Sequence, residues 1–258
     1  MRLTDQERWR YREPPLARAG AEAIQRREEW VRVIRKALPE EPLDVLELGC
    51  APGTLSAAVM LDRPWTPFGI DYSPDADRYV ETLRGLGMTP TLWKGDLFET
   101  RLERTFDVVC SFGLIEHFRG GTLDSLLALH DDYLKPGGHL VIAVPNFTGF
   151  QYFWHYLFDR PDLDNHNVDV MQPATFRWFE ERGYRTLYRD YCGRMRLWGN
   201  SGWTFNRFTG KAVAALAKGI SAVAGGLARI GLKLRGRSWS PYFLYIARKP
   251  GSTRNAAA

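Results

Sequence analysis

The stretch VLELGCAPGT, residues 45–54, places an apolar run directly before two glycines. The run predicts a buried strand that ends at Glu47. Gly49 and Gly53 predict a tight turn after it, because glycine adopts left-handed backbone at little steric cost. A glycine turn between a strand and a helix forms a nucleotide-type pocket in many α/β proteins, although it also occurs as a plain connection. The stretch therefore favours an α/β fold with a candidate ligand loop.

The alternation of short apolar runs and helical segments continues along the chain. Strands are predicted at 44–50, 67–73, 89–96, 106–113 and 139–146, with helices at about 54–61, 74–86 and 122–134 between them. Strands that alternate with helices form βαβ crossovers, so this part predicts a doubly wound parallel sheet covered on both faces. Two further strands are predicted at 186–192 and 240–250, and one amphipathic helix over 17–38 precedes the sheet.

The composition narrows the class of protein. The chain has 258 residues, of which 45% are hydrophobic and 25% charged, as in ordinary globular domains. No apolar run of membrane-spanning length is free of charge, and the N-terminus lacks the apolar core of a secretory signal, so we expect a cytoplasmic protein without a transmembrane helix. Cys50, Cys110 and Cys192 are far apart and form no C-x-x-C pair, which argues against a zinc site and a disulfide framework.

The charge of the chain is distributed unevenly. Residues 191–258 contain 12 Lys and Arg and no Asp or Glu, whereas residues 1–190 contain 30 acidic and 23 basic side chains. Such asymmetry predicts an anionic partner, which could be a membrane surface, a phosphorylated substrate or a nucleic acid. The alternative is a solvated basic face that serves solubility.

Acidic residues gather at the predicted carboxyl ends of the strands, where ligands bind in a doubly wound sheet. Glu47 ends the first strand, Asp71 the second and Asp96 the third. Asp71 follows Gly49 by 22 residues, where a dinucleotide-binding unit places the acid that accepts ribose hydroxyls; its alternative role is an acid near the next helix N-terminus. A nicotinamide-dependent oxidoreductase is disfavoured, because the loop reads G-C-A-P-G-T and not G-x-G-x-x-G.

Five motifs occur in order over residues 43–146: ELGCAPGT, GIDYS, KGD, FDVVCSFGLIEHF and LKPGGHLVIAVPN. In this order and spacing they resemble the successive motifs of class I S-adenosylmethionine-dependent methyltransferases. The most similar group is the small-molecule enzymes that include the ubiquinone-biosynthesis O-methyltransferases, and a weaker match covers residues 165–184. The resemblance implies a Rossmann-like, seven-stranded, mostly parallel sheet and S-adenosylmethionine as the cofactor.

The resemblance also implies a role for each residue of this rim towards the cofactor. Glu47 is expected to face the ammonium group, Asp71 to accept from the ribose hydroxyls and Asp96 to accept from the adenine amino group. The other implied cofactor-binding residues are Gly49, Cys50, Ala51, Gly53, Tyr72, Leu97, Ser111 and Phe112. Ala51 departs from the family pattern, which usually has glycine there, and its methyl group narrows the approach of the backbone to a ligand.

The same resemblance divides the chain into an N-terminal helical cap at 1–42 and a methyltransferase domain at 43–258. Within the domain, residues of about 147–185 are expected to form a lid over the acceptor, and about 203–238 a basic amphipathic helical insertion. The lid is dense in aromatic residues, which either line an apolar acceptor pocket or form the core of the lid. Acceptor specificity is expected to lie in these insertions, because sites vary freely on one fold.

A hydroxyl acceptor benefits from a general base, and His117 and His166 are the catalytic candidates. His117 follows the fourth strand on the cofactor rim, where a purely structural role is the alternative, and His166 lies in the lid. Glu116, Asp164 and the histidines are possible metal ligands, but we expect no metal, because they lack H-x-x-x-H or similar ligand spacing. Ser-Phe-Gly after the fourth strand differs from the Asn/Asp-Pro-Pro-aromatic pattern of enzymes that methylate base amino groups. We therefore predict O-methylation of a small-molecule or lipid-linked acceptor.

Apolar residues recur at alternating intervals of three and four over 213–234, with basic residues on the opposite face. Such a helix fits an anionic membrane surface, predicted here for 205–237, but it could instead pack on the catalytic domain or on a second subunit of a homodimer. No nucleic-acid-binding module is recognised. The alternative function is a non-catalytic protein of the same fold that serves as a membrane-associated or heteromeric partner, which the intact Gly49, Asp71 and Asp96 disfavour.

Overall fold

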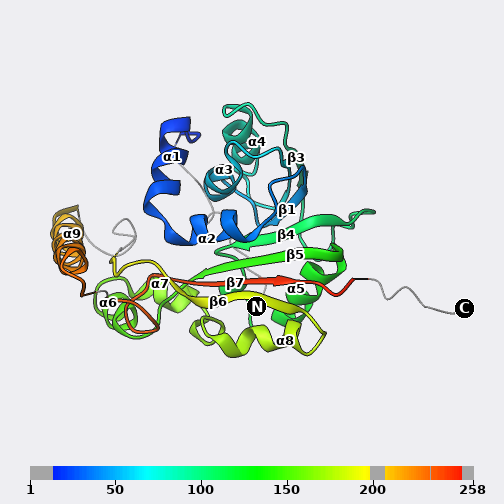
Figure 1. Ribbon diagram of the computed structural model, residues 1–258. Coiled ribbons are helices and arrows are strands. Elements are labelled where there is room, and N and C mark those ends of the chain that lie inside the picture. The colour runs from blue at the N-terminus through cyan, green and yellow to red at the C-terminus, as the bar shows by residue number, and fades with distance from the viewer. Residues whose placement is uncertain (1–13, 198–206, 233, 252–258) are drawn as a thin grey trace, which may run out of the picture.

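The computed structural model describes residues 14–197, 207–232 and 234–251, and a seven-stranded sheet forms its centre (Figure 1). The strands are β1 (Asp44–Leu48), β2 (Thr66–Asp71), β3 (Thr91–Lys94), β4 (Phe106–Phe112), β5 (Leu134–Pro145), β6 (Arg185–Cys192) and β7 (Tyr242–Arg248). Their order is β3-β2-β1-β4-β5-β7-β6. The pairs among β1 to β5 are parallel, whereas β7 is antiparallel to β5 and β6. The predicted Rossmann-like, mostly parallel sheet is confirmed.

Helices cover both faces of this sheet. The α-helices are α1 (Arg18–Arg27), α2 (Glu29–Ala37), α3 (Thr54–Met60), α4 (Asp77–Arg84), α5 (Gly120–Asp132), α6 (Phe150–Phe158), α7 (Arg160–Asn165), α8 (Arg177–Glu180) and α9 (Arg207–Arg229). Single turns of 3-10 helix are η2 (Ile115–His117), η3 (Val168–Val170) and η4 (Pro173–Phe176). Because strand side chains alternate, Leu46 of β1 packs in the core with α5 and α8, whereas Val45 packs in the core with α2 and α3.

The N-terminal segment forms two helices and not the single amphipathic helix that the sequence predicts. Glu28 has extended backbone (φ −88°, ψ 111°) between α1 and α2. Its buried carboxylate accepts from Nη1 of Arg196 at 2.7 Å, a contact that sequence periodicity cannot indicate. The break lets α2 turn Trp30 and Ile34 into the core against the sheet.

The segment expected to form the lid lies between β5 and β6 along the chain. It contains α6, α7, η3, η4 and α8; in Figure 1, α6 and α7 lie near the left end of β6 and β7, and α8 lies below β6. Phe176 of η4 stacks on Phe243 and Tyr245 of β7, with ring centroids 5.3 and 4.6 Å apart. The segment is thus anchored on the antiparallel side of the sheet. Its coverage of an acceptor stays a prediction.

Helix α9 lies at one end of the molecule beside α6 (Figure 1). Ala217 and Ala224 are buried in a small core with Trp154 of α6. The sequence predicts one apolar stripe for this helix, but Leu216 and Val223 of that stripe are exposed. The apolar face is therefore wider than the contact it makes. The predicted segments 203–238 and 205–237 lie partly outside the described residues, at positions up to 206 and at 233.

One stretch of α9, Ala212–Arg229, could cross a membrane as judged by length and composition only, and 11% of it is buried. The sequence predicts no transmembrane helix, because no apolar run of that length is free of charge. This stretch contains Lys218 and Arg229 but is apolar enough in spite of them, since most of its other side chains are aliphatic.

Candidate functional site

The turn predicted at the end of β1 is present, and it needs glycine at both positions. Gly49 (φ +69°) and Gly53 (φ +83°) both have left-handed backbone. A Cβ on Gly49 would lie 2.7 Å from Cδ1 of Leu114, and one on Gly53 would lie 3.0 Å from the Cα of Tyr79. The chain therefore bends closely between β1 and α3, where a side chain would fill the space or strain the backbone.

Asp71 ties this turn to the loop that follows β2. Its Oδ2 accepts from the Ala51 N–H at 2.8 Å, and its Oδ1 accepts from the Ser73 N–H at 2.7 Å. Burial raises the pKa of Asp71, and the two backbone donors oppose that shift. An ionised carboxylate has about four acceptor positions, so two bonds leave capacity for ribose hydroxyls. Helix α4 begins only at Asp77, so Asp71 belongs to the strand end and not to the helix N-terminus.

Glu47 is buried beneath the same turn. Its Oε2 accepts a hydrogen bond from the Ser56 hydroxyl of α3, which links β1 to the helix that follows the turn. Burial raises the pKa of Glu47 well above its usual range, and repulsion from Asp71 adds to the shift. A neighbouring cation would favour the ionised form. The predicted contact with the cofactor ammonium group is untested and stays a prediction.

Cys50 and Tyr72 lie next to these acids. The Cys50 side chain is buried against Gly69 of β2, where an added Cβ would come 2.5 Å from Sγ. Burial raises the pKa of the Cys50 thiol well above its usual range, so it is neutral and serves packing. Tyr72 directly follows β2 and is half-buried, as expected of a side chain that flanks a ligand at the rim.

The third and fourth strands bring the remaining predicted residues to the same edge. Asp96, half-buried after β3, accepts from the Phe98 N–H at 2.8 Å through Oδ1, and Leu97 is buried in the main core. Ser111 and Phe112 end β4, and the Phe112 ring lies 5.5 Å from that of Trp30. The structure therefore brings the predicted cofactor residues to the carboxyl ends of β1, β2, β3 and β4.

Sequence reasoning missed the partner of Ser111, which is His130 of α5. The Leu126 carbonyl lies 2.8 Å from Nδ1 of His130, so Nδ1 carries the proton and donates. Nε2 then accepts from the Ser111 hydroxyl at 3.0 Å. Burial lowers the pKa of His130 to about 4, which keeps the ring neutral. Only the tertiary contact between α5 and β4 defines this pair, so no local motif could have indicated it.

The two catalytic candidates come together beyond β4. His117 of η2 and His166, which follows α7, have ring centroids 4.7 Å apart. Burial, together with His166, lowers the pKa of His117 to about 3. A base with so low a pKa takes up a proton poorly at neutral pH. The predicted base role of either histidine is untested and stays a prediction.

A second group of titratable side chains lies beside these histidines. His155, Asp159 and Asp162 each present a ligand atom within 4.8 Å of the others. Burial and repulsion from Asp159 raise the pKa of Asp162 to about 7. His155 lies in α6, Asp159 lies between the two helices and Asp162 lies in α7, so the bend at Asp159 brings them together, and their spacing of four and three residues does not indicate it. Asp164, which sequence analysis considered, instead pairs with Arg160 at 2.7 Å on the surface.

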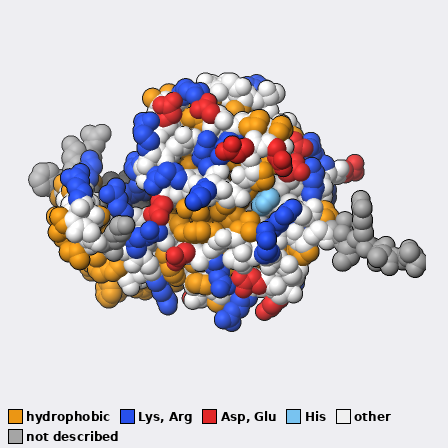
Figure 2. Space-filling view, in the orientation of Figure 1, with side chains coloured by type: hydrophobic (Ala, Val, Ile, Leu, Met, Phe, Trp, Pro, Cys, Tyr) orange, Lys and Arg blue, Asp and Glu red, His pale blue; other side chains and the backbone are white. Residues whose placement is uncertain are grey.

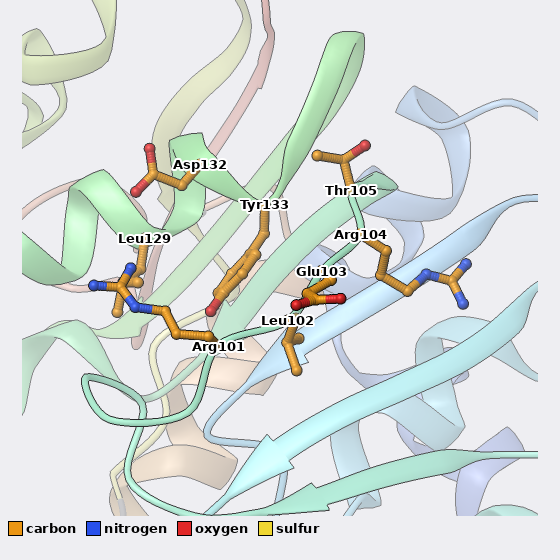
Figure 3. A pocket seen from close by; sticks show the side chains of 8 residues that line it. All are labelled: Arg101, Leu102, Glu103, Arg104, Thr105, Leu129, Asp132 and Tyr133. Carbon is orange, nitrogen blue, oxygen red and sulfur yellow. The ribbon is translucent and has the colours of Figure 1, made fainter.

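A surface pocket lies elsewhere in the molecule. It is lined by Arg101, Leu102, Glu103, Arg104, Thr105, Leu129, Asp132 and Tyr133 (Figure 3). Thr105 directly precedes β4, so this pocket lies at the amino end of that strand. Ligands of doubly wound sheets bind at the carboxyl ends. The pocket is therefore separate from the turn at Gly49 and Gly53.

The comparisons with known proteins agree with this geometry. A family model described as a methyltransferase domain matches residues 23–188, which is more than half of the chain. The chain belongs to this family of S-adenosylmethionine-dependent methyltransferases. The closer likeness to the ubiquinone-biosynthesis group is not tested by this match and stays an expectation.

One curated relative has similarity over part of the chain. The biotin biosynthesis bifunctional protein BioCD of Bordetella avium (strain 197N) is 32% identical over 127 residues, which are 48% of this chain and 26% of that protein. The chain thus matches about a quarter of the length of that relative.

Solved structures share the fold at low sequence identity. The N-methyltransferase NodS from Bradyrhizobium japonicum WM9, crystallised with S-adenosylhomocysteine, has a TM-score of 0.55 at 15% identity and covers 95% of this chain and 97% of NodS. A SAM-dependent methyltransferase from Archaeoglobus fulgidus has a TM-score of 0.54 at 21% identity, with coverages of 89% and 94%. An O-methyltransferase family protein from Burkholderia thailandensis has a TM-score of 0.54 at 16% identity, with coverages of 91% and 58%.

The Gly53→Ala variant should unfold more easily than the Gly87→Ala variant. Both glycines have φ close to +82°, but a Cβ meets backbone only at Gly53, and nothing lies within 4 Å at Gly87. Backbone strain costs about 1–2 kcal/mol at either position, and overpacking adds about 1–3 kcal/mol at Gly53. Urea unfolding measures the difference, and equal losses would show that the turn relaxes freely.

The Asp71→Asn variant should bind S-adenosylhomocysteine more weakly. The amide keeps only one acceptor oxygen, so it loses hydrogen bonds to a charged group worth about 1.5–3 kcal/mol, or roughly 10- to 100-fold in Kd. Isothermal titration calorimetry measures the change. The Asp77→Asn variant is the matched control, because its carboxylate pairs with Lys94 on the surface. An unchanged Kd in Asp71→Asn would remove Asp71 from the cofactor site.

Proposed function

We propose that this methyltransferase methylates an oxygen atom of an apolar, lipid-linked acceptor at the periphery of a membrane in the cytoplasm. The observation that carries the proposal is the exposed apolar surface of α6 and α9 next to the histidine-bearing end of the sheet. Figure 2 shows hydrophobic side chains gathered at the left of the view, over these two helices. Phe153 of α6 is 65% exposed, and Val223 and Ile230 are 65% and 74% exposed.

Helix α6 connects this surface to the candidate active site. Its outer face presents the exposed Tyr152, Phe153 and Tyr156. Its inner face buries His155, whose ring stacks on Phe147 with centroids 4.0 Å apart. Phe147 also packs on His166, at 4.6 Å. Only helix α6 thus lies between the exposed apolar surface and the histidines. This arrangement suits an acceptor that has a lipid tail and a reactive head group.

Basic side chains accompany the apolar surface. Lys218 and Arg229 of α9 and Arg237 after it are exposed. Arg235 nearby forms an ion pair with Glu29 at 2.7 Å. A helix that combines an apolar face with exposed cations binds anionic lipid through buried area and charge together. The excess of 12 basic residues over 191–258 supports the same partner.

The residues at the strand ends fit S-adenosylmethionine. The left-handed Gly49 and Gly53 allow close approach of the backbone, and Asp71 and Asp96 offer acceptor oxygens for hydroxyl and amino groups. When bound, S-adenosylmethionine supplies an electrophilic methyl carbon, whose bond to sulfur breaks as the bond to the acceptor oxygen forms. The chain contributes alignment of the acceptor beside His117 and His166, and the hydroxyl proton is released to solvent as the methyl group is transferred.

Incubation of the enzyme with membrane lipids and S-adenosylmethionine labelled with ¹³C in the methyl group tests the reaction. We expect the label in an organic-soluble product, with the carbon chemical shift of a methyl group on oxygen. The Asp71→Asn variant should label the same product more slowly. Label on nitrogen, or only in water-soluble products, would contradict the proposed acceptor and leave the family assignment intact.

The Val223→Asp variant should bind vesicles of phosphatidylglycerol at least about tenfold more weakly than the unaltered chain, because burial of one valine is worth about 1.5–3 kcal/mol. Flotation measures the bound fraction. Ser125→Asp on α5 is the matched control, since it adds the same charge on an exposed helix elsewhere in the fold. Failure of the unaltered chain to float would overturn the membrane proposal, and a dimer in sedimentation would assign the apolar face to a second copy.

A further inference from the structure

Three possible metal ligands converge where the lid segment meets the end of β4. Glu116 and His117 belong to η2, and His166 follows α7 some fifty residues later. One donor atom from each lies within 4.8 Å of the others. The Asn167 N–H donates to the Glu116 carbonyl at 2.6 Å, and Asn167 Nδ2 donates to the Phe118 carbonyl at 2.9 Å. These two hydrogen bonds therefore hold the two segments in this arrangement.

Both histidines are oriented as metal ligands are. A carbonyl only accepts, so the Asp162 carbonyl 2.6 Å from Nδ1 of His166 fixes the proton on that nitrogen. The Asn165 carbonyl, 3.3 Å from Nδ1 of His117, does the same there. Each neutral ring then carries its lone pair on Nε2. Histidine ligands in metalloproteins commonly donate their other ring N–H to a carbonyl or carboxylate, which fixes the tautomer.

Glu116 provides the independent observation that points to a cation. Its residue is 1% exposed, and its Oε2 has no hydrogen-bond partner among the described residues. Its Oε1 lies 4.0 Å from Nε2 of His117. Burial raises the pKa of Glu116 to about 8, and repulsion from Asp162 adds to the shift. An unpartnered buried oxygen costs free energy that a bound cation would offset.

We propose that Glu116, His117 and His166 bind one divalent transition-metal ion, each through a carboxylate oxygen or Nε2. Two imidazoles and one carboxylate suit Zn²⁺, Fe²⁺ or Mn²⁺ better than Mg²⁺ or Ca²⁺, which prefer oxygen ligands alone. Ligand atoms about 2 Å from a shared ion lie roughly 3–4 Å apart, so the group must contract slightly on binding. Three protein ligands leave positions for water or for an oxygen of the acceptor.

The site gives the two histidines a different role from the one that the sequence suggests. A divalent ion would lower the pKa of a bound hydroxyl, whose proton could then pass to solvent water without a separate strong base. This role rests on the proposed O-methylation, whereas the binding of the ion does not. The expectation that no metal binds rests on the spacing of residues within one motif. Such spacing cannot reveal a ligand from another segment, such as His166 of the lid segment.

A neighbouring group could hold the ion instead. His155, Asp159 and Asp162 form a second cluster within 4.8 Å, and Oδ1 of Asp162 lies 3.8 Å from Nδ1 of His166. The Glu116 group is preferred because its Oε2 is buried without a partner and its histidine tautomers are fixed. Separate substitutions in the two groups distinguish them.

Calorimetric titration of chelator-treated full-length protein with Zn²⁺, and the visible absorption of bound Co²⁺, test the site without any acceptor. We expect one ion per chain and at least a tenfold weaker Kd in Glu116→Gln and in His166→Gln. Glu116→Gln preserves shape and leaves the buried side chain neutral, so it should fold. The matched controls are His139→Gln, at a half-buried histidine of β5, and Asp159→Asn in the second cluster, and both should bind as the unaltered chain does.

The outcomes separate the site from the proposed function. No bound ion in the unaltered chain, or equal binding in Glu116→Gln and His166→Gln, overturns the site. Lost binding in Asp159→Asn with normal binding in Glu116→Gln also overturns it. Should Glu116→Gln not fold, His166→Gln alone decides, with retained S-adenosylhomocysteine binding as the check of folding. A metal that binds as expected while the methyl label appears on nitrogen keeps the site and removes the O-methylation.

Discussion

The carboxylate of Asp71 holds the candidate site together. One oxygen accepts from Ala51 in the turn after β1, and the other accepts from Ser73 in the loop after β2. Parallel strands place these loops at one edge, but nothing in the strand pairing fixes their distance. A single buried side chain therefore sets the spacing of the backbone groups that face a ligand. Glu47 supports the same turn from below through Ser56 of α3.

The fold and the strand-end residues of the site can be predicted from local sequence, because they depend on periodicity and on order along the chain. The alternation that begins at VLELGCAPGT predicts the sheet, and Asp71 and Asp96 fall at strand ends that every βαβ unit places on one edge. The break at Glu28 and the Ser111–His130 pair could not be predicted in this way. Each depends on a partner distant in sequence, Arg196 for Glu28 and α5 for Ser111.

The histidines illustrate the same limit. His117 is recognisable as a rim residue because it follows β4, but its environment is set by His166, Asn165 and Glu116. Burial there lowers the pKa of the imidazole and raises that of the carboxyl, an environment that the motif alone cannot indicate. Likewise, the stripe on α9 predicts an apolar face, whereas the width of its contact depends on Trp154 of α6.

The register of the last two strands has a consequence for how this chain can diverge. Cys192 at the end of β6 lies directly opposite Tyr242 at the start of β7, as the ends of a hairpin do. Two residues would suffice to join them, yet the chain makes an excursion from 193 to 241 that includes α9. The pairing of β6 with β7 does not depend on α9. Evolution can therefore lengthen or recharge that helix, and so redirect the enzyme to another surface, while the strand order stays unaltered.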